Sequence, residues 1–209
     1  NIIIILLKQC LPSAIPIVQS SNDDVYLWRM GNEAPTDRFS TAKTWRVLHP
    51  PNPPVYWHAQ IWFKGRVPKH AFIAWLVVWN RLATRDRMRG WGIDVSPSCL
   101  LCSGLDESRQ HLFFDCTFSA EIWTYFCSRL HLSPPVLLED CIRWLKALSS
   151  DTNTLLVIKL VFQAVIYMVW RERNSRLHTN ICRPAQNIIN DIKKTLRLRL
   201  DPISRNMRL

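Results

Sequence analysis

The sequence predicts a mainly α-helical protein, made of a small helical domain with at most one short N-terminal β-hairpin and a C-terminal helical extension. Three observations lead to this fold class. In most segments after residue 40 the apolar residues recur every three or four positions, which is the spacing of one helix face. Hydrophobic residues make up 48% of the 209 residues, enough to form a core. A Cys-Cys-His-Cys cluster between residues 99 and 116 supplies a centre around which such a domain can be organised.

Residues 1–24 are predicted to be an irregular lead-in, and residues 25–56 a hairpin followed by a helix. Pro12, Pro16 and a Ser-Ser-Asn-Asp-Asp run interrupt the first segment. The pattern after it indicates a short strand over 25–28, a turn over 30–35 and a partner strand at 38–39. Ser40 is the expected N-cap of a helix that ends at about Leu48, before the prolines that occupy four of the positions 50–54.

The next unit, residues 57–126, contains the most apolar helix of the chain, from residue 69 or 70 to about residue 82. From Phe72 to Trp79 large apolar residues recur at i, i+3, i+4 and i+7, and aliphatic residues fill the opposite side. We therefore expect that little of this helix faces water and that it is central to the fold. A short basic helix over 85–89 follows, with Thr84 as its N-cap and Gly90 as its stop.

Residues 127–209 are predicted to be a basic helical extension. Helices are expected over about 119–130, 136–148, 152–178 and 184–200, the last with an apolar stripe on one side. The run of 16 mostly apolar residues from 155 to 170 contains Lys159 and Gln163. It is too short and too polar to span a bilayer, so a buried helix explains it better and no membrane partner is expected.

The cysteine content indicates a reducing, intracellular compartment. Seven cysteines are too few and too unevenly spaced for a disulfide framework, and an odd number would leave one thiol unpaired. Nothing in the sequence separates nucleus from cytoplasm. The chain starts without Met, without a basic segment and without a cleavage site, so its start is interpreted as a fragment boundary and not as a signal peptide.

The cysteine-histidine cluster has the spacing Cys99-x2-Cys102-x8-His111-x4-Cys116. Two cysteines separated by two residues can bind one metal ion from a tight turn, and the loop after them can return a histidine and a third cysteine to complete a tetrahedral shell. The pattern predicts one structural Zn²⁺ in a zinc-knuckle-like site, with no open coordination position. The alternative is that these are unrelated buried thiols, since free cysteine is common in protein cores.

The net charge of +11 is concentrated in two segments. Residues 64–90 contain seven basic side chains and one acidic, and residues 171–209 contain ten basic and three acidic, whereas the segment between them is mildly acidic. This distribution is typical of a surface that binds an acidic partner, although ordinary solvated helix faces are the alternative. The candidate nucleic-acid-binding residues are Lys64, Arg66, Lys69, Arg81, Arg85, Arg87, Arg89, Arg171, Arg173, Arg176, Lys193, Lys194, Arg197 and Arg199.

Several short motifs stand in order along the chain: "YWHAQIW", "PKHAFIAWLVVWNRLATRDRMRGWG", "CLLC", Glu107, "HLFFDC" and "IW" at 122–123. In this order they resemble the zinc-binding domain of plant reverse transcriptases, the accessory module that follows the polymerase in non-LTR retroelements (retrotransposons) and related genomic proteins. Upstream "DVYLWRMGNEAPTDRFSTAKTW" and downstream "VWRERNSRLH" are similar to the family too, so the resemblance extends over about residues 23–178.

The resemblance places the zinc ligands on Cys99, Cys102, His111 and Cys116, the same four residues that the spacing selects. One departure concerns the residue after the second cysteine, where the family commonly has glycine. Here Ser103 stands at that position and Gly104 follows it. The departure affects the geometry expected for the turn and not the ligand set.

The resemblance implies a non-catalytic module whose partners are RNA or an RNA–DNA hybrid, with a reverse transcriptase catalytic domain as a further partner. A polymerase or ribonuclease H centre would need converging carboxylates, and the adjacent Asp23 and Asp24 are interpreted as part of a turn. The sequence contains only five glycines, with no glycine-rich phosphate loop, no G-x-S-x-G and no H-E-x-x-H motif. We therefore expect no enzyme activity and no small-molecule substrate.

Two alternatives to nucleic acid binding stay open. The chain can be a structural or protein-interaction domain that braces a polymerase, or the remnant of a decayed retroelement without activity. One contiguous basic patch favours nucleic acid, whereas cations scattered around the molecule favour bracing. Single-strand binding would also need exposed aromatic side chains, but most of the tryptophans lie at helical core spacing.

Overall fold

The computed structural model describes residues 25–50, 52–148 and 151–206, together with residues 5, 9–11, 18–21 and 23; of residues 202–206 it describes the backbone alone. The chain divides into two compact units, Asn1–Pro53 and Pro54–Leu209. Most of the predicted lead-in over residues 1–24 lies outside the described residues.

In the N-terminal unit, helix α3 (Thr41–Leu48) begins where the sequence predicts it. The Ser40 side chain accepts a hydrogen bond from the Lys43 backbone N–H at 3.3 Å, as an N-cap residue does. The predicted hairpin is reduced to a single antiparallel bridge between Trp28 and Thr36, with N···O distances of 2.6 and 2.9 Å. Trp28 therefore pairs with Thr36 and not with residues 38–39, and the described part of the chain forms no strand. An isolated pair of strands is marginal in water, so little stabilises a longer ladder here.

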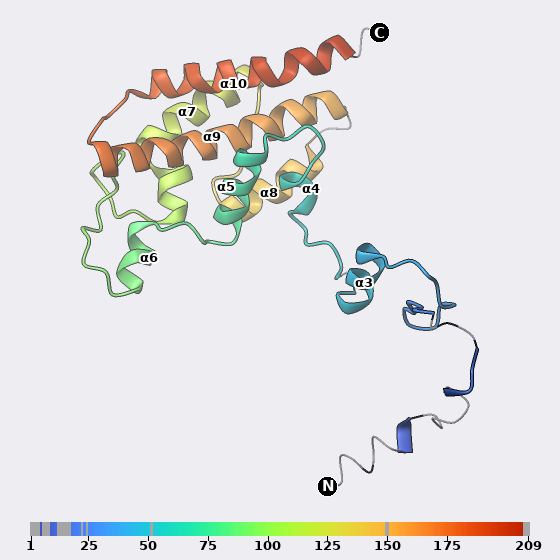
Figure 1. The fold of residues 1–209 in the computed structure, drawn as a ribbon. Helices are drawn as coiled ribbons and strands as arrows, with labels where there is room; N and C mark the ends of the chain where they lie inside the picture. The colour runs from blue at the N-terminus through green and yellow to red at the C-terminus, as the bar shows by residue number, and fades with distance from the viewer. Residues whose placement is uncertain are drawn as a thin grey trace. The chain divides into compact units, whose positions relative to one another are not determined.

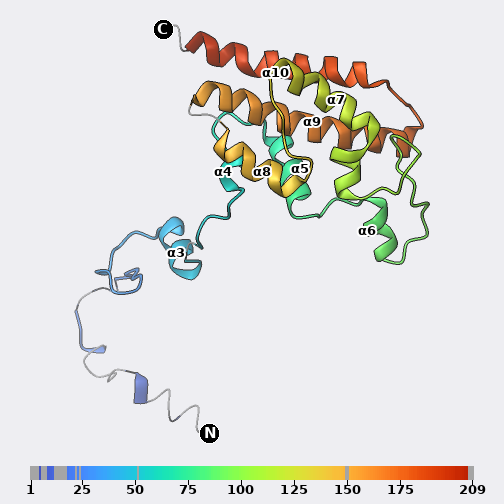
Figure 2. The ribbon, with the colours of Figure 1, turned by 180° about the vertical axis from the view of Figure 1, so that it is seen from behind.

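The C-terminal unit is built around helix α9 (Thr152–Thr179). This helix contacts α4 (His58–Ile61), α5 (Pro68–Val78), α7 (Thr117–Arg129), α8 (Leu138–Ala147) and α10 (Ala185–Asn206). In Figures 1 and 2, α10 runs antiparallel beside α9, and α4, α5 and α8 lie on the opposite side of α9. The mainly helical fold class is confirmed.

Helix α9 has the length and hydropathy of a membrane span, but 61% of its most apolar window is buried inside the protein. The two polar residues in its apolar run have partners there. Lys159 Nζ donates to the Ala59 carbonyl at 2.9 Å, and Gln163 Nε2 donates to the Ile61 carbonyl at 2.8 Å. Both acceptors belong to α4, whose last carbonyls have no partner within such a short helix.

Helix α5 ends four residues before its predicted end, because Asn80 stops it. Asn80 has a φ of +50°, its N–H donates to the Val77 carbonyl at 2.9 Å, and the Arg81 N–H donates to the Leu76 carbonyl at 2.8 Å. These two bonds form a Schellman motif, in which asparagine takes the place of the more frequent glycine.

The expectation that little of α5 faces water is wrong. Four residues of this helix are buried: His70, Ala71, Ala74 and Val77. Phe72 and Trp79 are each 49% exposed, although they belong to the stripe of largest apolar residues. Helices approach most closely through small side chains, so α5 packs mainly through its alanines. Phe72 and Trp79 stay exposed, whereas Trp75 between them packs partly against the core.

The other predicted helices are present, with bounds within about two residues of those expected, except that α10 continues to Asn206 and not to about residue 200. Two short elements were not predicted, α4 and a π-helical turn, η1 (His111–Asp115), because four or five residues carry too little periodicity. Thr84 precedes α6 (Arg85–Gly90), but its side chain makes no capping bond. Instead the Arg85 N–H donates to the Glu107 carboxylate at 3.0 Å, and the next N–H donates to the Glu107 carbonyl at 3.1 Å.

Candidate metal centre

Cys99, Cys102, His111 and Cys116 converge in the C-terminal unit, and their four ligand atoms all lie within 4.8 Å of one another. The sulfur atoms of Cys99 and Cys116 are 3.9 Å apart, and Cys102 Sγ is 3.3 Å from His111 Nε2. A tetrahedral ion with bonds of about 2.3 Å to sulfur and about 2.0 Å to nitrogen requires separations of about 3.8 Å and about 3.5 Å. The donor set and its spacing fit, so this Cys3His site can hold one zinc ion.

The first two cysteines lie on a loop that is closed by an antiparallel bridge between Ser98 and Asp106. Inside the loop, the Leu101 N–H donates to Cys99 Sγ at 3.4 Å. This bond points a backbone dipole at the sulfur, which favours its negatively charged form. At Cys99 the bond to Cys116 and burial outweigh this effect, so its pKa lies above the usual value.

Ser103 occupies the position at which the resembling family commonly has glycine, and its conformation explains that preference. The φ of Ser103 is +56°, in the left-handed region, whereas Gly104 does not adopt a positive φ. The displaced glycine therefore leaves the turn intact, and serine holds it at a cost of about 1 kcal/mol.

The second pair of metal-type residues, His111 and Cys116, is placed by η1. The His111 N–H donates to the Ser108 hydroxyl at 3.1 Å, and the Cys116 N–H donates to the His111 carbonyl at 2.7 Å, five residues back, as in a π-helix. Cys116 is also the N-cap of α7, where the nearby backbone N–H groups of Ser119 and Phe118 help to lower the pKa of its thiol. The positive end of α7 thus faces this ligand.

The two most buried sulfurs interact directly. The Cys99 thiol donates to Cys116 Sγ. This bond and burial both raise the pKa of Cys99, whereas at Cys116 the same bond lowers the pKa by more than burial raises it. Cys116 is therefore the first of the pair to ionise, and a bound dication deprotonates coordinating thiols outright. Three thiolates and a neutral imidazole give the complete site a charge of about −1, so the metal itself does not attract phosphates.

A buried ion pair ties the metal loop to α9. The guanidinium of Arg173 donates to the Glu107 carboxylate at 2.8 to 3.3 Å, and these side chains are 2% and 0% exposed. The same carboxylate holds the start of α6 through the Arg85 N–H. The prediction that Arg173 contacts nucleic acid is therefore wrong, because its guanidinium is buried and already paired.

Arg176, another predicted nucleic acid contact, supports the loop between Cys99 and Cys102. Its Nη1 donates to the Leu100 and Leu101 carbonyls at 3.3 and 2.9 Å. Its Nε pairs with Glu172 at 3.0 Å, and Glu172 also pairs with Arg183 at 2.9 Å. Burial raises the pKa of Glu172, but the bonds to these arginines outweigh it and lower that pKa below its usual value. This part of the "VWRERNSRLH" motif is thus a support of the metal loop.

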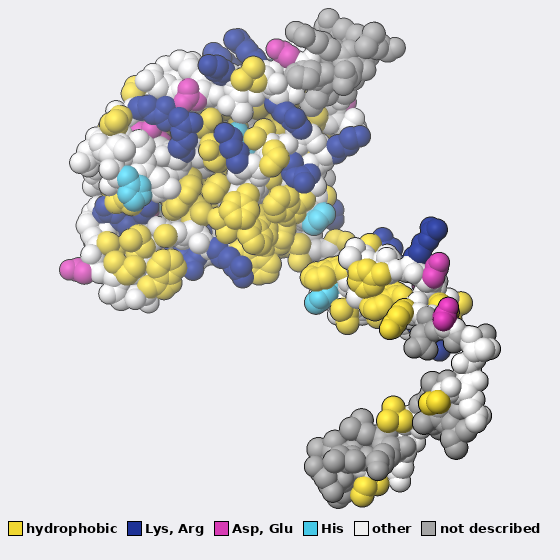
Figure 3. All heavy atoms as spheres, in the orientation of Figure 1, with side chains coloured by type: hydrophobic (Ala, Val, Ile, Leu, Met, Phe, Trp, Pro, Cys, Tyr) yellow, Lys and Arg dark blue, Asp and Glu magenta, His cyan; other side chains and the backbone are white. Residues whose placement is uncertain are grey.

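The other predicted cations differ in what their side chains contact. A first group donates to backbone carbonyls: Arg66, Arg85, Arg87 and Arg199. Lys193 is partly buried beside the ring of Tyr125. The remaining predicted cations are exposed: Lys64, Lys69, Arg81, Arg89, Arg171, Lys194 and Arg197. Figure 3 shows the Lys and Arg side chains distributed over the visible face of the C-terminal unit, with hydrophobic side chains between them, and not in one block.

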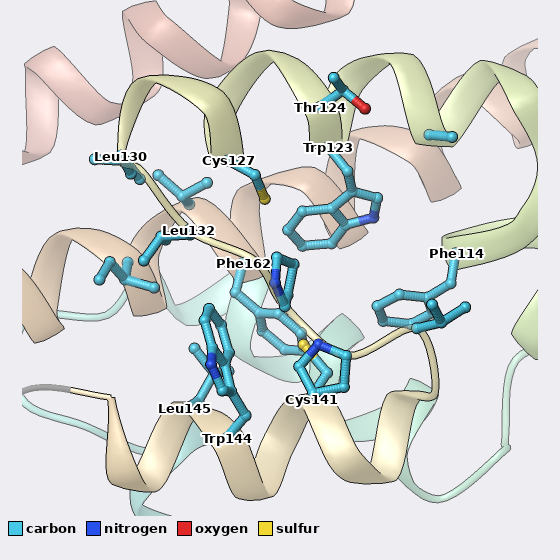
Figure 4. A pocket seen from close by; sticks show the side chains of 16 residues that line it. Phe114, Trp123, Thr124, Cys127, Leu130, Leu132, Cys141, Trp144, Leu145 and Phe162 are labelled. Carbon is cyan, nitrogen blue, oxygen red and sulfur yellow. The ribbon is translucent and has the colours of Figure 1, made fainter.

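An apolar pocket of about 160 Å³ lies between α7, α8 and α9, and none of the four metal-type residues lines it. Figure 4 shows Trp123, Phe162 and Trp144 around it, with the sulfur atoms of Cys127 and Cys141. Burial raises the pKa of Cys141 to about 12. The lining contains no Asp, Glu, His, Lys or Arg.

Residues 39–123 match a family model described as zinc-binding in reverse transcriptase. The match contains all four residues of the metal site and confirms the family that the motifs indicate. It covers less than half of the chain and ends in α7, whereas the motif resemblance continues to about residue 178. Comparison with curated proteins and with solved structures found no match.

Proposed function

We propose that this chain carries a zinc-stabilised, non-catalytic accessory module of a reverse transcriptase, and that the module binds RNA or an RNA–DNA hybrid. The family match and the Cys3His site support its zinc-binding part. Its nucleic acid binding rests on one observation, that cations from two distant segments stay exposed on the unit that contains the metal site. Such side chains neutralise phosphates and release counterions.

Two further features support the remaining parts of the proposal. Four protein ligands complete a tetrahedral shell, which is typical of a structural zinc and leaves no position for a substrate. Within the described ranges, no other group of three or more metal-type side chains is close enough to hold an ion. We place the protein in a reducing, intracellular compartment, where the three thiols stay available to the metal.

The test measures binding of the zinc-loaded full chain to labelled RNA and to an RNA–DNA hybrid at increasing salt. With about five phosphates contacted, log affinity should fall with log salt at a slope of about −3.5 for a single strand and about −4.5 for a duplex. Lys194→Glu with Arg197→Glu should weaken binding and flatten this slope. The matched control, Lys146→Glu with Arg46→Glu, changes exposed cations outside the two basic segments and should have little effect. Binding that is undetectable or independent of salt would contradict the proposal.

A second candidate is a domain that braces the catalytic part of a reverse transcriptase. The scatter of the cations in Figure 3 and the exposure of apolar side chains on α5 favour it. Analytical ultracentrifugation of the chain with a reverse transcriptase catalytic domain distinguishes the two. A stable complex formed by a chain that binds no nucleic acid would replace the first proposal by this one.

A further inference from the structure

Three aromatic side chains lie along one side of α5 and its C-cap, two of them exposed and one partly packed against the core. Phe72 and Trp79 are each 49% exposed, and Trp75 is partly exposed. The rings of Phe72 and Trp75 are 5.7 Å apart, and Trp79 meets the buried Trp57 edge-on at 5.9 Å, which holds its indole in place. Figure 3 shows a broad hydrophobic area at the position of α5. An exposed patch of this kind marks a binding surface.

A cation links the two indoles. The Schellman motif at the end of α5 turns the chain back at Asn80, and the Arg81 guanidinium then lies 5.9 Å from the Trp75 ring and 5.4 Å from the Trp79 ring. These distances are within the range of cation–π attraction. Together with Phe72, these residues form a continuous row, which we name the α5 platform: Phe72, Trp75, Trp79 and Arg81.

The surroundings of the α5 platform favour an anionic partner. Residues 54–84 contain no Asp and no Glu. The same segment contains four basic side chains, namely Lys64, Arg66, Lys69 and Arg81. The carboxylate of Glu139 pairs with Arg109 at 2.6 Å, and Arg109 in turn donates to the last carbonyls of α5. The negative charge of Glu139, which lies near the end of α5, is therefore balanced by Arg109.

From the exposed rings, the linking cation and the acid-free segment, we propose that the rings of the α5 platform stack the unpaired bases of a single-stranded nucleic acid, while Arg81 and the neighbouring cations contact its phosphates. This inference rests on the proposed function and specifies where, and in which form, the nucleic acid binds. A single strand offers flat apolar bases and phosphates together, and proteins bind it by this combination of aromatic rings and positive charge. An apolar protein surface would leave the cations without a partner.

The dimensions and geometry of the platform favour a strand over a duplex. From Phe72 to Trp79 it extends about 10 Å along the helix, at about 1.5 Å per residue. That length corresponds to about three bases at a rise of about 3.4 Å each. Bases inside a duplex are covered by their neighbours, so only unpaired bases can lie on the rings.

The experiment measures fluorescence anisotropy of a 12-nucleotide RNA strand and of its duplex, with the zinc-loaded full chain. Phe72→Ala and Trp79→Ala should each weaken strand binding about ten-fold, without changing the salt slope, because a stacking contact is lost and no phosphate contact. Arg81→Ala should reduce the slope by about 1. Trp45→Ala is the matched control, since this tryptophan is 64% exposed and lies in the N-terminal unit. Trp79→Tyr keeps a stacking ring and should retain most of the affinity.

The outcomes separate this inference from the proposed function. A wild type that binds neither strand nor duplex overturns both. A wild type that binds, with Phe72→Ala and Trp79→Ala binding as tightly, overturns the platform alone, and so does equal affinity for strand and duplex. Loss of affinity with an unchanged melting temperature supports the platform. Where Trp79→Ala fails to fold, Phe72→Ala and Trp79→Tyr decide the question.

Discussion

Removal of the Glu107 carboxylate should destabilise the C-terminal unit strongly. In Glu107→Ala the Arg173 guanidinium, only 2% exposed, loses its carboxylate partner in the interior, and the Arg85 N–H at the start of α6 loses its acceptor. Breaking a buried ion pair at one partner costs about 3 to 5 kcal/mol, and the loss of a helix cap adds about 1 kcal/mol. The total, about 4 to 6 kcal/mol, is a large part of the 5 to 15 kcal/mol or so that stabilises a typical protein. We expect a melting temperature lowered by about 10 °C or more.

Urea unfolding of the zinc-loaded protein, followed by circular dichroism, measures this loss. The matched control is Glu139→Ala, which breaks a 2.6 Å ion pair between Glu139 and Arg109. Because the Glu139 side chain is 45% exposed, this variant should lose less than about 1 kcal/mol of unfolding free energy. The double variant Glu107→Leu with Arg173→Met removes both charges and should recover most of the stability. If Glu107→Ala costs no more than Glu139→Ala, the buried pair does not hold the metal loop to α9.

Cys102→Ser should release zinc and unfold at least residues 91–125, because the free energy of binding a structural zinc is folding free energy; equal melting temperatures with and without a chelator would contradict this. Ser103→Gly should raise the free energy of unfolding by up to about 1 kcal/mol by relieving a φ of +56°. Gly104→Ala should change the free energy of unfolding little, because its new Cβ would meet only the Cys102 carbonyl at 3.8 Å. If urea unfolding shows a larger gain for Gly104→Ala than for Ser103→Gly, this account of the turn is refuted. Burial, and then the charge of Lys69, lower the pKa of His70 from 6.5 to about 4, so the unfolded chain takes up a proton that the folded protein does not. Stability should therefore fall by about 2 to 3 kcal/mol as the pH drops from 6.5 to 4, and His70→Phe, compared at each pH, should lose this part of the dependence.

The metal site could be predicted because its four residues lie within one short segment. Their spacing alone shows that they can reach one ion, and the same local reasoning identified Ser40 as a helix cap. The roles of the charged residues could not be found in this way. Glu107 and Arg173 are 66 residues apart, and Arg176 reaches a carbonyl 76 residues back, so no local pattern distinguishes them from surface cations. Arg173 lies in a basic segment and was assigned to a surface for that reason.

The burial of α5 was misjudged for a different reason. Helical spacing offers two stripes on this helix, one aromatic and one made of small residues such as Ala71 and Ala74, and hydrophobicity favours the aromatic one. The choice depends on which side the partner helix can approach most closely, and that is a property of the pair of helices. Phe72 and Trp79, interpreted as core residues, therefore lie at the surface, and Trp75 is buried only in part.

The supports of the metal loop indicate that zinc binding and the folding of α9 are coupled. Arg173 and Arg176 lie one turn apart on this helix; the first holds Glu107, and the second holds the carbonyls between the first two cysteine ligands. In a zinc knuckle that folds by itself, the metal orders only the segment that binds it. Here the bonds exist only when the loop and the end of α9 are both folded, and without the loop a buried guanidinium loses its partner. The free energy of zinc binding must therefore extend to the end of α9. This accounts for the position of the "WRERN" motif, which lies beyond the matched segment and supplies no ligand, yet belongs to the same folding unit.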